Sequence, residues 1–357
     1  MTRAGALHFL IPGDLQTRTG GYGYDRRIIT ELRALGWQVT VHALDASFPQ
    51  PHPAALEHAR RVLADLPSQA LVLIDGLALG AMPQIAQAHA ARLHLVALVH
   101  HQLAAERGLA PEVARELARS ERLALAAVRH IIVTSDVTRE GLRELGVEPP
   151  RISVVEPGTD AAPLARRARG ATLQLLCVAT VIPRKGHDLL FTALSALRAV
   201  PWHLTCVGSL TRDPDTVARL RTQLQRLELE GRVRFAGEMH AAELSQAYAD
   251  TDLFVLPTHF EGYGMVVAEA LARGLPVVST RVGAVAALVG ATAGVLVAPG
   301  DAQLLAAALR HVLTEPGVLD DLAAGAASVR GSLPDWQQAG ERMSGILQNS
   351  LQRLQGR

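Results

Sequence analysis

Two halves of the chain repeat one rhythm, in which short apolar runs alternate with longer stretches of helical periodicity. This alternation is typical of βαβ units, where helices join parallel strands. The 357 residues are too many for one ordinary core and suit two domains. We therefore expect an α/β fold of two Rossmann-like parallel-sheet domains that face each other, with ligands at the carboxyl ends of the strands.

The apolar runs predict the positions of the strands. In the first half they lie at 7–11, 38–44, 70–74, 93–100, 131–134 and 152–155, and in the second at 173–179, 203–207, 233–236, 253–256, 276–279 and 294–297. An arginine-rich segment with a proline, 161–170, predicts a linker. We expect domains at 1–165 and 166–335. An amphipathic C-terminal helical segment follows at 336–357 and either stays with the second domain or crosses back to the first.

Composition excludes several classes of protein. With 35 basic and 34 acidic residues, the net charge of +1 argues against a nucleic-acid partner. The chain contains no apolar run of about 20 residues and no recognisable signal peptide, so we expect a cytoplasmic protein with at most peripheral membrane association. Cys177 and Cys206 lie in apolar runs, which indicates buried thiols rather than a disulfide or metal pair.

The most informative motif lies at 257–278 and reads PTHFEGYGMVVAEALARGLPVV. A strand ends before it, a loop carries Glu261 and two glycines, and a helix carrying Glu269 follows. Glycines allow close backbone approach, and free N–H groups at a helix N-terminus attract an anion such as a diphosphate. Two carboxylates would repel that anion, so we expect them to face neutral hydroxyls of a sugar or ribose. The alternative is two solvated glutamates beside an ordinary turn.

The second motif, at 178–190, reads VATVIPRKGHDLL and presents Arg184 and Lys185 between a strand and a helix. Lys185 is the only lysine among the 35 basic residues, in a chain whose arginine bias is typical of a GC-rich, bacterial coding background. Cations at a helix N-terminus are unfavourable without an anion, which indicates a bound anion rather than a solvated turn. Because the sequence shows no His/Asp cluster with metal spacing, we expect no metal and no cofactor.

Two weaker signals lie in the first half. Gly20 and Gly21 form a predicted glycine-rich loop after the first strand, although a glycine turn alone has little specificity. His100 and His101 follow a strand directly, where a histidine can also be an ordinary surface residue. Strand neighbours face opposite sides, so the pattern leaves open which histidine points inward.

The spacing of Glu261 and Glu269, with seven residues between them, resembles the E-x7-E motif of retaining GT-B glycosyltransferases. The surrounding residues are similar to family 4 in particular, over nearly the whole chain. The resemblance implies a GT-B fold, with two Rossmann-like domains facing across a cleft. It also implies that Glu261 contacts sugar hydroxyls of the donor, that Glu269 binds the ribose, and that Arg184 and Lys185 neutralise the diphosphate.

The same resemblance assigns further positions. Gly20 and Gly21 would close over the diphosphate, and His100 would lie near the reacting sugar as a catalytic group beside Glu261, Arg184 and Lys185. His101 and Tyr22 would lie on the acceptor side. The remaining donor-binding positions are Glu238 and Met239 near the base, and Gly262, Tyr263, Gly264, Met265, Val266 and Val267 at the diphosphate. Pro157 stands where many family members have asparagine, which leaves any side-chain role at that position unassigned.

The function implied is transfer of a hexose-type sugar, with retention and without a metal, from a UDP- or GDP-sugar to a hydroxyl acceptor such as a glycan, a lipid-linked glycan or a small molecule. Three other classes stay open: a nucleotide-sugar epimerase of similar shape, a non-catalytic sugar-nucleotide-binding partner and a nicotinamide dehydrogenase. The last is disfavoured because no clear G-x-G-x-x-G follows the first strand.

Overall fold

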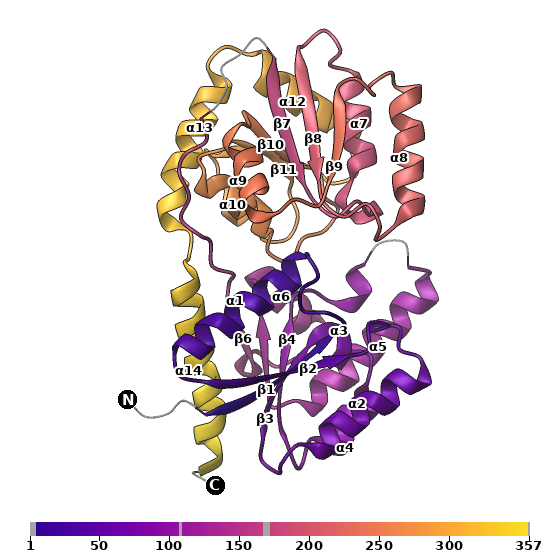
Figure 1. The fold of residues 1–357 in the computed structure, drawn as a ribbon, viewed down its shortest axis with the longest axis vertical. Coiled ribbons are helices and arrows are strands. Elements are labelled where there is room, and N and C mark those ends of the chain that lie inside the picture. The colour runs from indigo at the N-terminus through magenta and orange to yellow at the C-terminus, as the bar shows by residue number, and fades with distance from the viewer. Residues whose placement is uncertain (1–4, 107–108, 167–171, 356–357) are drawn as a thin grey trace. The chain divides into compact units, whose positions relative to one another are not determined.

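The computed structural model describes residues 5–106, 109–166 and 172–355. The chain forms two compact units, residues 1–158 with 334–357 and residues 159–333. Each unit is a parallel sheet flanked by helices (Figure 1). The predicted linker 161–170 lies partly outside the described residues, since 167–171 are not among them.

The sheet of unit 1 has six strands in the order β2-β1-β3-β4-β5-β6. The strands are β1 (Ala6–Pro12), β2 (Gln38–Leu44), β3 (Leu71–Asp75), β4 (His94–Val99), β5 (His130–Val133) and β6 (Ile152–Val154). The main helices are α1 (Gly20–Ala34), α2 (Pro53–Asp65), α3 (Gly76–Leu79), α4 (Pro83–His89), α5 (Pro111–Ala127), α6 (Asp136–Glu144) and α14 (Trp336–Gln355). Every residue of β3 and β4 is buried, which requires cover on both faces of the sheet.

The glycine pair near the N-terminus begins a helix, so the expectation of a loop at Gly20 and Gly21 is wrong. Thr19 caps α1, because its side chain accepts a hydrogen bond from the Tyr22 amide at 3.4 Å. The cap compensates for the poor helix propensity of glycine.

The C-terminal helix α14 packs against α1 within unit 1, where the Trp37 indole donates to the Ser344 hydroxyl at 2.8 Å. The predicted amphipathic helix is therefore present and begins at Trp336, as expected.

The sheet of unit 2 also has six strands, in the order β12-β11-β10-β7-β8-β9. The strands are β7 (Leu173–Val178), β8 (Trp202–Val207), β9 (Val233–Gly237), β10 (Leu253–Leu256), β11 (Val277–Thr280) and β12 (Gly294–Val297). The helices are α7 (His187–Ser195), α8 (Pro214–Arg226), α9 (Ala241–Ala249), α10 (Met265–Ala272), α11 (Val285–Val289), α12 (Ala302–Thr314) and α13 (Val318–Val329).

Both sheets reverse their strand order at one point. In unit 1 the chain runs from β1 outward to β2 and then returns to β3, and in unit 2 it runs from β7 to β8 and β9 and returns to β10. The reversals lie between β1 and β3 and between β7 and β10. In open α/β sheets, ligands bind at the carboxyl ends of the strands beside such a reversal.

The structure confirms the two-sheet α/β expectation, and each predicted strand has its counterpart with ends that differ by at most one residue. Cys177 and Cys206 are free and buried, as expected. Of the described helices, none combines the length and the apolar character that a membrane crossing needs.

Candidate functional site

The two charged motifs of unit 2 lie side by side because they follow neighbouring strands. β7 leads into the turn of Arg184 and β10 into the loop of His259 and Phe260. The His259 amide donates to the Arg184 carbonyl at 2.8 Å, and the Arg184 guanidinium donates to the Phe260 carbonyl at 2.9 Å. Backbone and side chain therefore join the two loops beside the strand-order reversal.

Gly186 allows this close approach. Its φ is +69°, and a Cβ built there would lie 2.1 Å from the Pro257 carbonyl oxygen. A side chain at this position would push the two loops apart, so the glycine after Arg184 and Lys185 is needed for the site to assemble.

Lys185 and Glu261 form an ion pair at the centre of the joined loops, between the lysine ammonium and Oε1 of the glutamate. Their side chains are only 14% and 10% exposed, which rules out the solvated-turn alternative for both residues. With Arg184 beside them, this cluster of three charges carries a net charge of +1. The Lys185 ammonium has three donors, so further hydrogen bonds to an anion are open to it.

The N-terminus of α10 lies directly after this pair. Gly264 precedes the helix with φ +98°, and no side chain caps the helix start. Residues 262–267 therefore bring their backbone to the carboxyl edge of the sheet next to Glu261, as the motif predicts. Glu238 and Met239 follow β9, the outermost strand at that end of the same sheet, and the Glu238 side chain is exposed.

Glu269 lies in the second turn of α10. Its neighbours are residues that the sequence analysis did not identify. The Tyr248 hydroxyl donates to its carboxylate at 3.0 Å, and Arg273 donates to its backbone carbonyl at 2.8 Å while stacking over the Tyr248 ring at 4.5 Å. Burial raises the pKa of Glu269, and the Tyr248 hydrogen bond and the Arg273 charge oppose the rise. The carboxylate is thus fixed in direction but poorly solvated.

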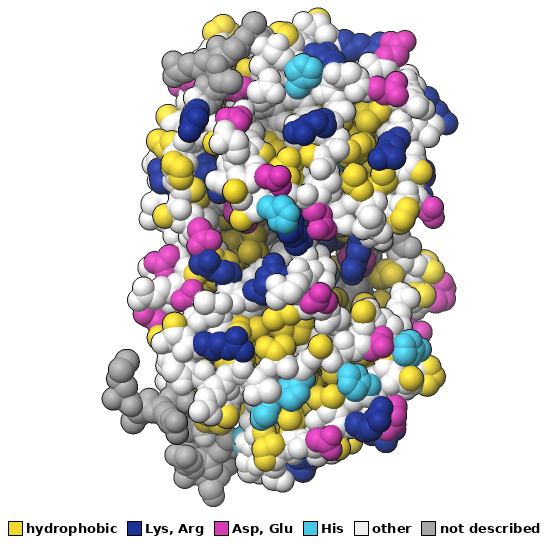
Figure 2. Space-filling model, in the orientation of Figure 1, with side chains coloured by type: hydrophobic (Ala, Val, Ile, Leu, Met, Phe, Trp, Pro, Cys, Tyr) yellow, Lys and Arg dark blue, Asp and Glu magenta, His cyan; other side chains and the backbone are white. Residues whose placement is uncertain are grey.

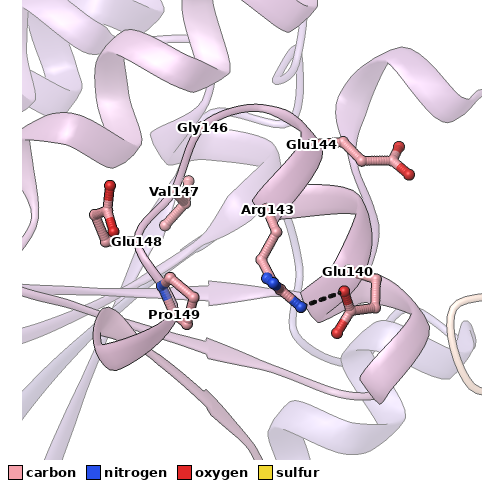
Figure 3. A pocket seen from close by; sticks show the side chains of 7 residues that line it. All are labelled: Glu140, Arg143, Glu144, Gly146, Val147, Glu148 and Pro149. Atoms are coloured by element: carbon pink, nitrogen blue, oxygen red, sulfur yellow. Dashed lines mark hydrogen bonds and ion pairs between the residues drawn. The ribbon is translucent and has the colours of Figure 1, made fainter.

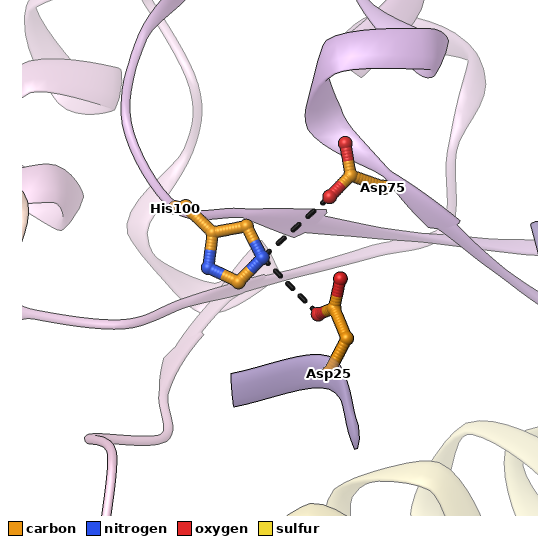
Figure 4. Close-up of side chains that lie close together, drawn as sticks. All are labelled: Asp25, Asp75 and His100. Carbon is orange, nitrogen blue, oxygen red and sulfur yellow. Dashed lines mark hydrogen bonds and ion pairs between the residues drawn. The ribbon is translucent and has the colours of Figure 1, made fainter. Parts of the chain in front are cut away.

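Unit 1 places His100 beside two buried carboxylates that both face its Nε2 (Figure 4). Its Nε2 lies 3.2 Å from Asp25 Oδ1 and 3.5 Å from Asp75 Oδ2. Asp25 comes from α1 and Asp75 ends β3, so the three groups meet beside the strand-order reversal of this sheet. Of the two histidines, His100 points toward this cluster, while His101 Nε2 lies 4.0 Å from Glu106.

The electrostatics of this cluster favour bound protons. Burial and the charge of Asp25 raise the pKa of Asp75 to about 7. Burial opposes protonation of His100, but the Asp25 charge and hydrogen bond, with the Asp75 charge, outweigh it and raise the pKa of His100. The three atoms lie within 4.8 Å of one another, so the same groups could hold a cation. The histidine–carboxylate contact at 3.2 Å is equally that of an N–H donor and its acceptor.

The sequence reasoning missed Asp25 and Asp75, yet both left a signal. Asp25 stands on the apolar stripe of α1 with Ile28, Ile29 and Leu32, where a buried acid is unusual. Asp75 directly ends a fully buried strand at the carboxyl edge of the sheet.

Gly21, predicted to bind the donor diphosphate, and Tyr22, predicted for the acceptor side, both lie on the first turn of α1. A Cβ at Gly21 would lie 3.4 Å from His100 Cδ2, so the glycine and the histidine are neighbours. The Tyr22 hydroxyl donates to the Pro12 carbonyl at 2.5 Å and ties the helix to the end of β1.

A separate hollow in unit 1 does not match the predicted chemistry. It lies at the C-terminal end of α6 and is lined by Glu140, Arg143, Glu144, Gly146, Val147, Glu148 and Pro149 (Figure 3). Arg143 already pairs with Glu140 at 2.7 Å. The remaining glutamates would repel a diphosphate, so this hollow is not the donor site.

Charged side chains of both signs lie on the face drawn in Figure 2. Basic and acidic side chains are interspersed there over both units. This matches the near-zero net charge.

The fold, with its two six-stranded parallel sheets, is that of a class, the two-domain glycosyltransferases of the GT-B type. Family models confirm it: "Glycosyltransferase Family 4" matches residues 26–162 and "Glycosyl transferases group 1" matches residues 172–315. Together these models cover most of the chain. The chain belongs to the family 4, or group 1, glycosyltransferases.

Relatives and solved structures agree with this assignment. D-inositol 3-phosphate glycosyltransferase of Kineococcus radiotolerans is 34% identical over 63% of this chain and 58% of that protein. Glycogen synthase of Mycobacterium tuberculosis is 33% identical over 52% of this chain and 45% of that protein. The chain thus spans less than two thirds of the curated relatives it matches.

Two solved structures share the fold. Sucrose-phosphate synthase from Thermosynechococcus elongatus has a TM-score of 0.82 at 20% identity and covers 98% of this chain and 99% of its own. Anabaena HepE in complex with UDP and glucose has a TM-score of 0.77 at 20% identity, covering 96% and 99%. At this identity the likeness concerns the fold alone.

Proposed function

We propose that this chain is a retaining, metal-independent glycosyltransferase that moves a hexose-type sugar from a UDP- or GDP-sugar to a hydroxyl acceptor. The observation that carries the proposal is the joining of the two charged loops of unit 2 through Lys185 and Glu261, beside the strand-order reversal. Membership of the glycosyltransferase family supplies the reaction class.

The donor nucleotide is assigned to unit 2. The positive balance of the Arg184, Lys185 and Glu261 cluster and the uncapped start of α10 suit a diphosphate, which needs charge and backbone donors together. Glu269, fixed by Tyr248, is suited to accept hydrogen bonds from two vicinal ribose hydroxyls. HepE, a protein of the same fold, has been solved with UDP-glucose.

The leaving group explains why a metal is not required in this proposal. When the glycosidic bond to the nucleoside diphosphate breaks, negative charge accumulates on the departing phosphate. Arg184 and Lys185 stabilise that charge electrostatically, the role that a divalent cation has in other transferases. Glu261 holds Lys185 in place and presents its second oxygen to the sugar.

The acceptor is assigned to unit 1. His100 lies beside its strand-order reversal, with Tyr22 on the adjoining helix turn. Polar side chains and a histidine suit a hydroxyl acceptor rather than a second nucleotide.

A panel of UDP-, GDP- and ADP-sugars tests the proposal. We expect slow hydrolysis to the nucleoside diphosphate with one base, in excess chelator, and release of a sugar whose first-formed anomer matches the donor in NMR. Isomerisation of the donor would indicate an epimerase, and binding without turnover a non-catalytic partner. Activity lost in chelator and restored by magnesium or manganese would contradict metal independence, and an inverted anomer would contradict retention.

A further inference from the structure

His100 is held along one edge of its ring by a single face of α1. Gly21 lies against Cδ2, the Tyr24 ring meets the imidazole edge-on at 5.3 Å and 82°, and Asp25 Oδ1 lies 3.2 Å from Nε2. Positions 21, 24 and 25 share one face of a helix because they are three and four residues apart. The backbone is tied as well, since the Thr134 and Thr138 hydroxyls donate to the His100 carbonyl at 3.3 and 3.4 Å.

Burial of Asp25 at this position lowers the stability of the folded protein. The residue is fully buried, and its second oxygen, Oδ2, has no hydrogen-bond partner among the described residues. A buried carboxylate with an unpartnered oxygen costs stability, and such groups persist where they serve a function. Asp75 differs, because its Oδ1 caps α3 by accepting from the Leu77 amide at 2.8 Å. Capping alone would account for Asp75 but not for Asp25.

The geometry also distinguishes the two ring nitrogens of His100. Nε2 faces both carboxylates, and Nδ1 lies on the side of the ring away from them (Figure 4). The side chain is 16% exposed, and the described residues include no hydrogen-bond partner for Nδ1. A hydrogen on Nε2 is therefore committed to the aspartates, and Nδ1 is the atom left for a ligand.

We propose that Asp25 is a positioning residue that fixes the ring and the protonation of His100, so that Nδ1–H is presented as a hydrogen-bond donor to an oxygen of the transferred sugar or of the acceptor. Asp75 assists as the second carboxylate on Nε2. The inference rests on the proposed sugar transfer only for the identity of that oxygen, and not for the state of the ring.

This arrangement differs from a histidine base. A base needs a free lone pair on the nitrogen that faces the substrate, whereas two carboxylates around Nε2 stabilise the cation, in which both nitrogens carry hydrogen. The groups that face the ring are Asp25 and Tyr24 from α1 and Asp75 at the end of β3. Both aspartates favour the imidazolium, consistent with the raised pKa of His100.

The test is a ring ¹⁵N NMR titration of the full chain labelled at histidine. The chain has 14 histidines, so the His100 signals are identified by their loss in His100→Gln. In the unmodified protein we expect His100 to titrate above 6.5 and, at high pH, to carry its hydrogen on Nε2. Asp25→Asn, which removes the charge, should lower that pKa by about one unit or more. Asp25→Ala, which removes the nearer acceptor, should weaken the Nε2–H preference, because Asp75 alone then faces Nε2.

Glu57→Gln is the matched control, because Glu57 lies on α2 of the same unit with its side chain 42% exposed. It should leave the His100 titration unchanged. A His100 that titrates at or below 6.5 in the unmodified protein, or that carries its hydrogen on Nδ1 at high pH, overturns the proposal even if no aspartate variant folds. His100 signals that shift on adding zinc or on adding chelator also overturn it, in favour of a cation at the three groups.

Kinetics of donor hydrolysis provide a second readout. For Asp25→Asn we expect kcat to fall about tenfold or more while KM for the donor and Kd for the nucleoside diphosphate stay within about twofold. A kcat that falls in His100→Gln but not in Asp25→Asn overturns the positioning role. If no donor is hydrolysed at all, the proposed function fails, and the NMR titration still decides the state of His100.

Discussion

Glu269 shows how a single carboxylate can be specialised by its neighbours. The Tyr248 hydroxyl donates a hydrogen bond that orients the Glu269 carboxylate. Burial raises the pKa of Glu269, which shows that its charged form lacks solvation when no ligand is bound. A ribose that supplies two hydroxyls would relieve this cost.

We therefore expect Glu269→Gln to weaken nucleoside diphosphate binding by about 1–3 kcal/mol, roughly five- to a hundred-fold in Kd. Tyr248→Phe should have a smaller effect, because the carboxylate stays in place. Isothermal titration calorimetry measures both, with exposed Glu230→Gln as the control. Equal affinity in Glu269→Gln and the unmodified chain would remove Glu269 from the ribose site.

Lys185 and Glu261 stabilise each other at low exposure, so each depends on the other. Removing one partner leaves the remaining charge partly buried and unpaired, whereas removing both leaves none. We expect Lys185→Met and Glu261→Gln each to lower the free energy of unfolding by about 1–3 kcal/mol. The double variant should lose less than the sum, with a coupling of about 0.5 kcal/mol or more. Urea denaturation of the four proteins gives the coupling, and strict additivity would show that the pair contributes nothing.

At the scale of elements, the site depends on how tightly the β7 and β10 loops approach. Gly186 combines φ +69° with a Cβ position 2.1 Å from the Pro257 oxygen. Gly317, in the same unit, has φ +83° and no atom within 4 Å of its Cβ position. Alanine would therefore be strained by the positive φ at both positions. Only at Gly186 would its Cβ also clash with a neighbouring atom, the Pro257 oxygen.

Gly317→Ala should lower the free energy of unfolding by about 1 kcal/mol through strain alone. Gly186→Ala should lower it by at least twice that amount and also weaken nucleoside diphosphate binding, because the clash separates Arg184 and Lys185 from the Glu261 loop. Chemical denaturation and calorimetry measure the two effects. If the two variants were equally stable and bound nucleotide equally, the close approach of the loops would have no role.

The elements that sequence predicts well are those whose physics is local. Buried parallel strands are continuous apolar runs, so strands such as β10 can be predicted from the local run of apolar residues alone. The Lys185–Glu261 pair spans 76 positions and exists only because β7 and β10 are neighbours, which no local pattern states. Asp25 and Tyr248 were missed for the same reason, since their partners come from other elements. The first turn of α1 was missed because the Thr19 cap outweighs the glycine pair.

At the scale of the whole molecule, buried and half-buried acids with raised pKa values gather in unit 1. Burial raises the pKa of Asp75 and of Glu121 to about 7, and it also raises that of Glu156. Glu269 is the counterpart in unit 2. An acid with a raised pKa binds its proton more tightly in the folded state than in the unfolded state, so stability falls as pH rises between the two values. His100 also makes stability fall as the pH rises above 6.5, because the pKa of His100 is raised in the folded state.

We therefore expect the chain to be less stable at pH 8 than at pH 5.5, with a Tm lower by about 3 °C or more. Asp75→Asn keeps the cap of α3, since an amide oxygen can accept from the Leu77 amide, but it cannot take up a proton. It should reduce the Tm difference. Asp213→Asn is the matched control: Asp213 also caps a helix, α8, but hydrogen bonds from Thr216 lower its pKa, so its contribution changes only below about pH 4. Differential scanning calorimetry at both pH values decides the matter. A Tm that rises from pH 5.5 to 8, or an unchanged difference in Asp75→Asn, would mean that Asp75 holds no extra proton in the folded protein.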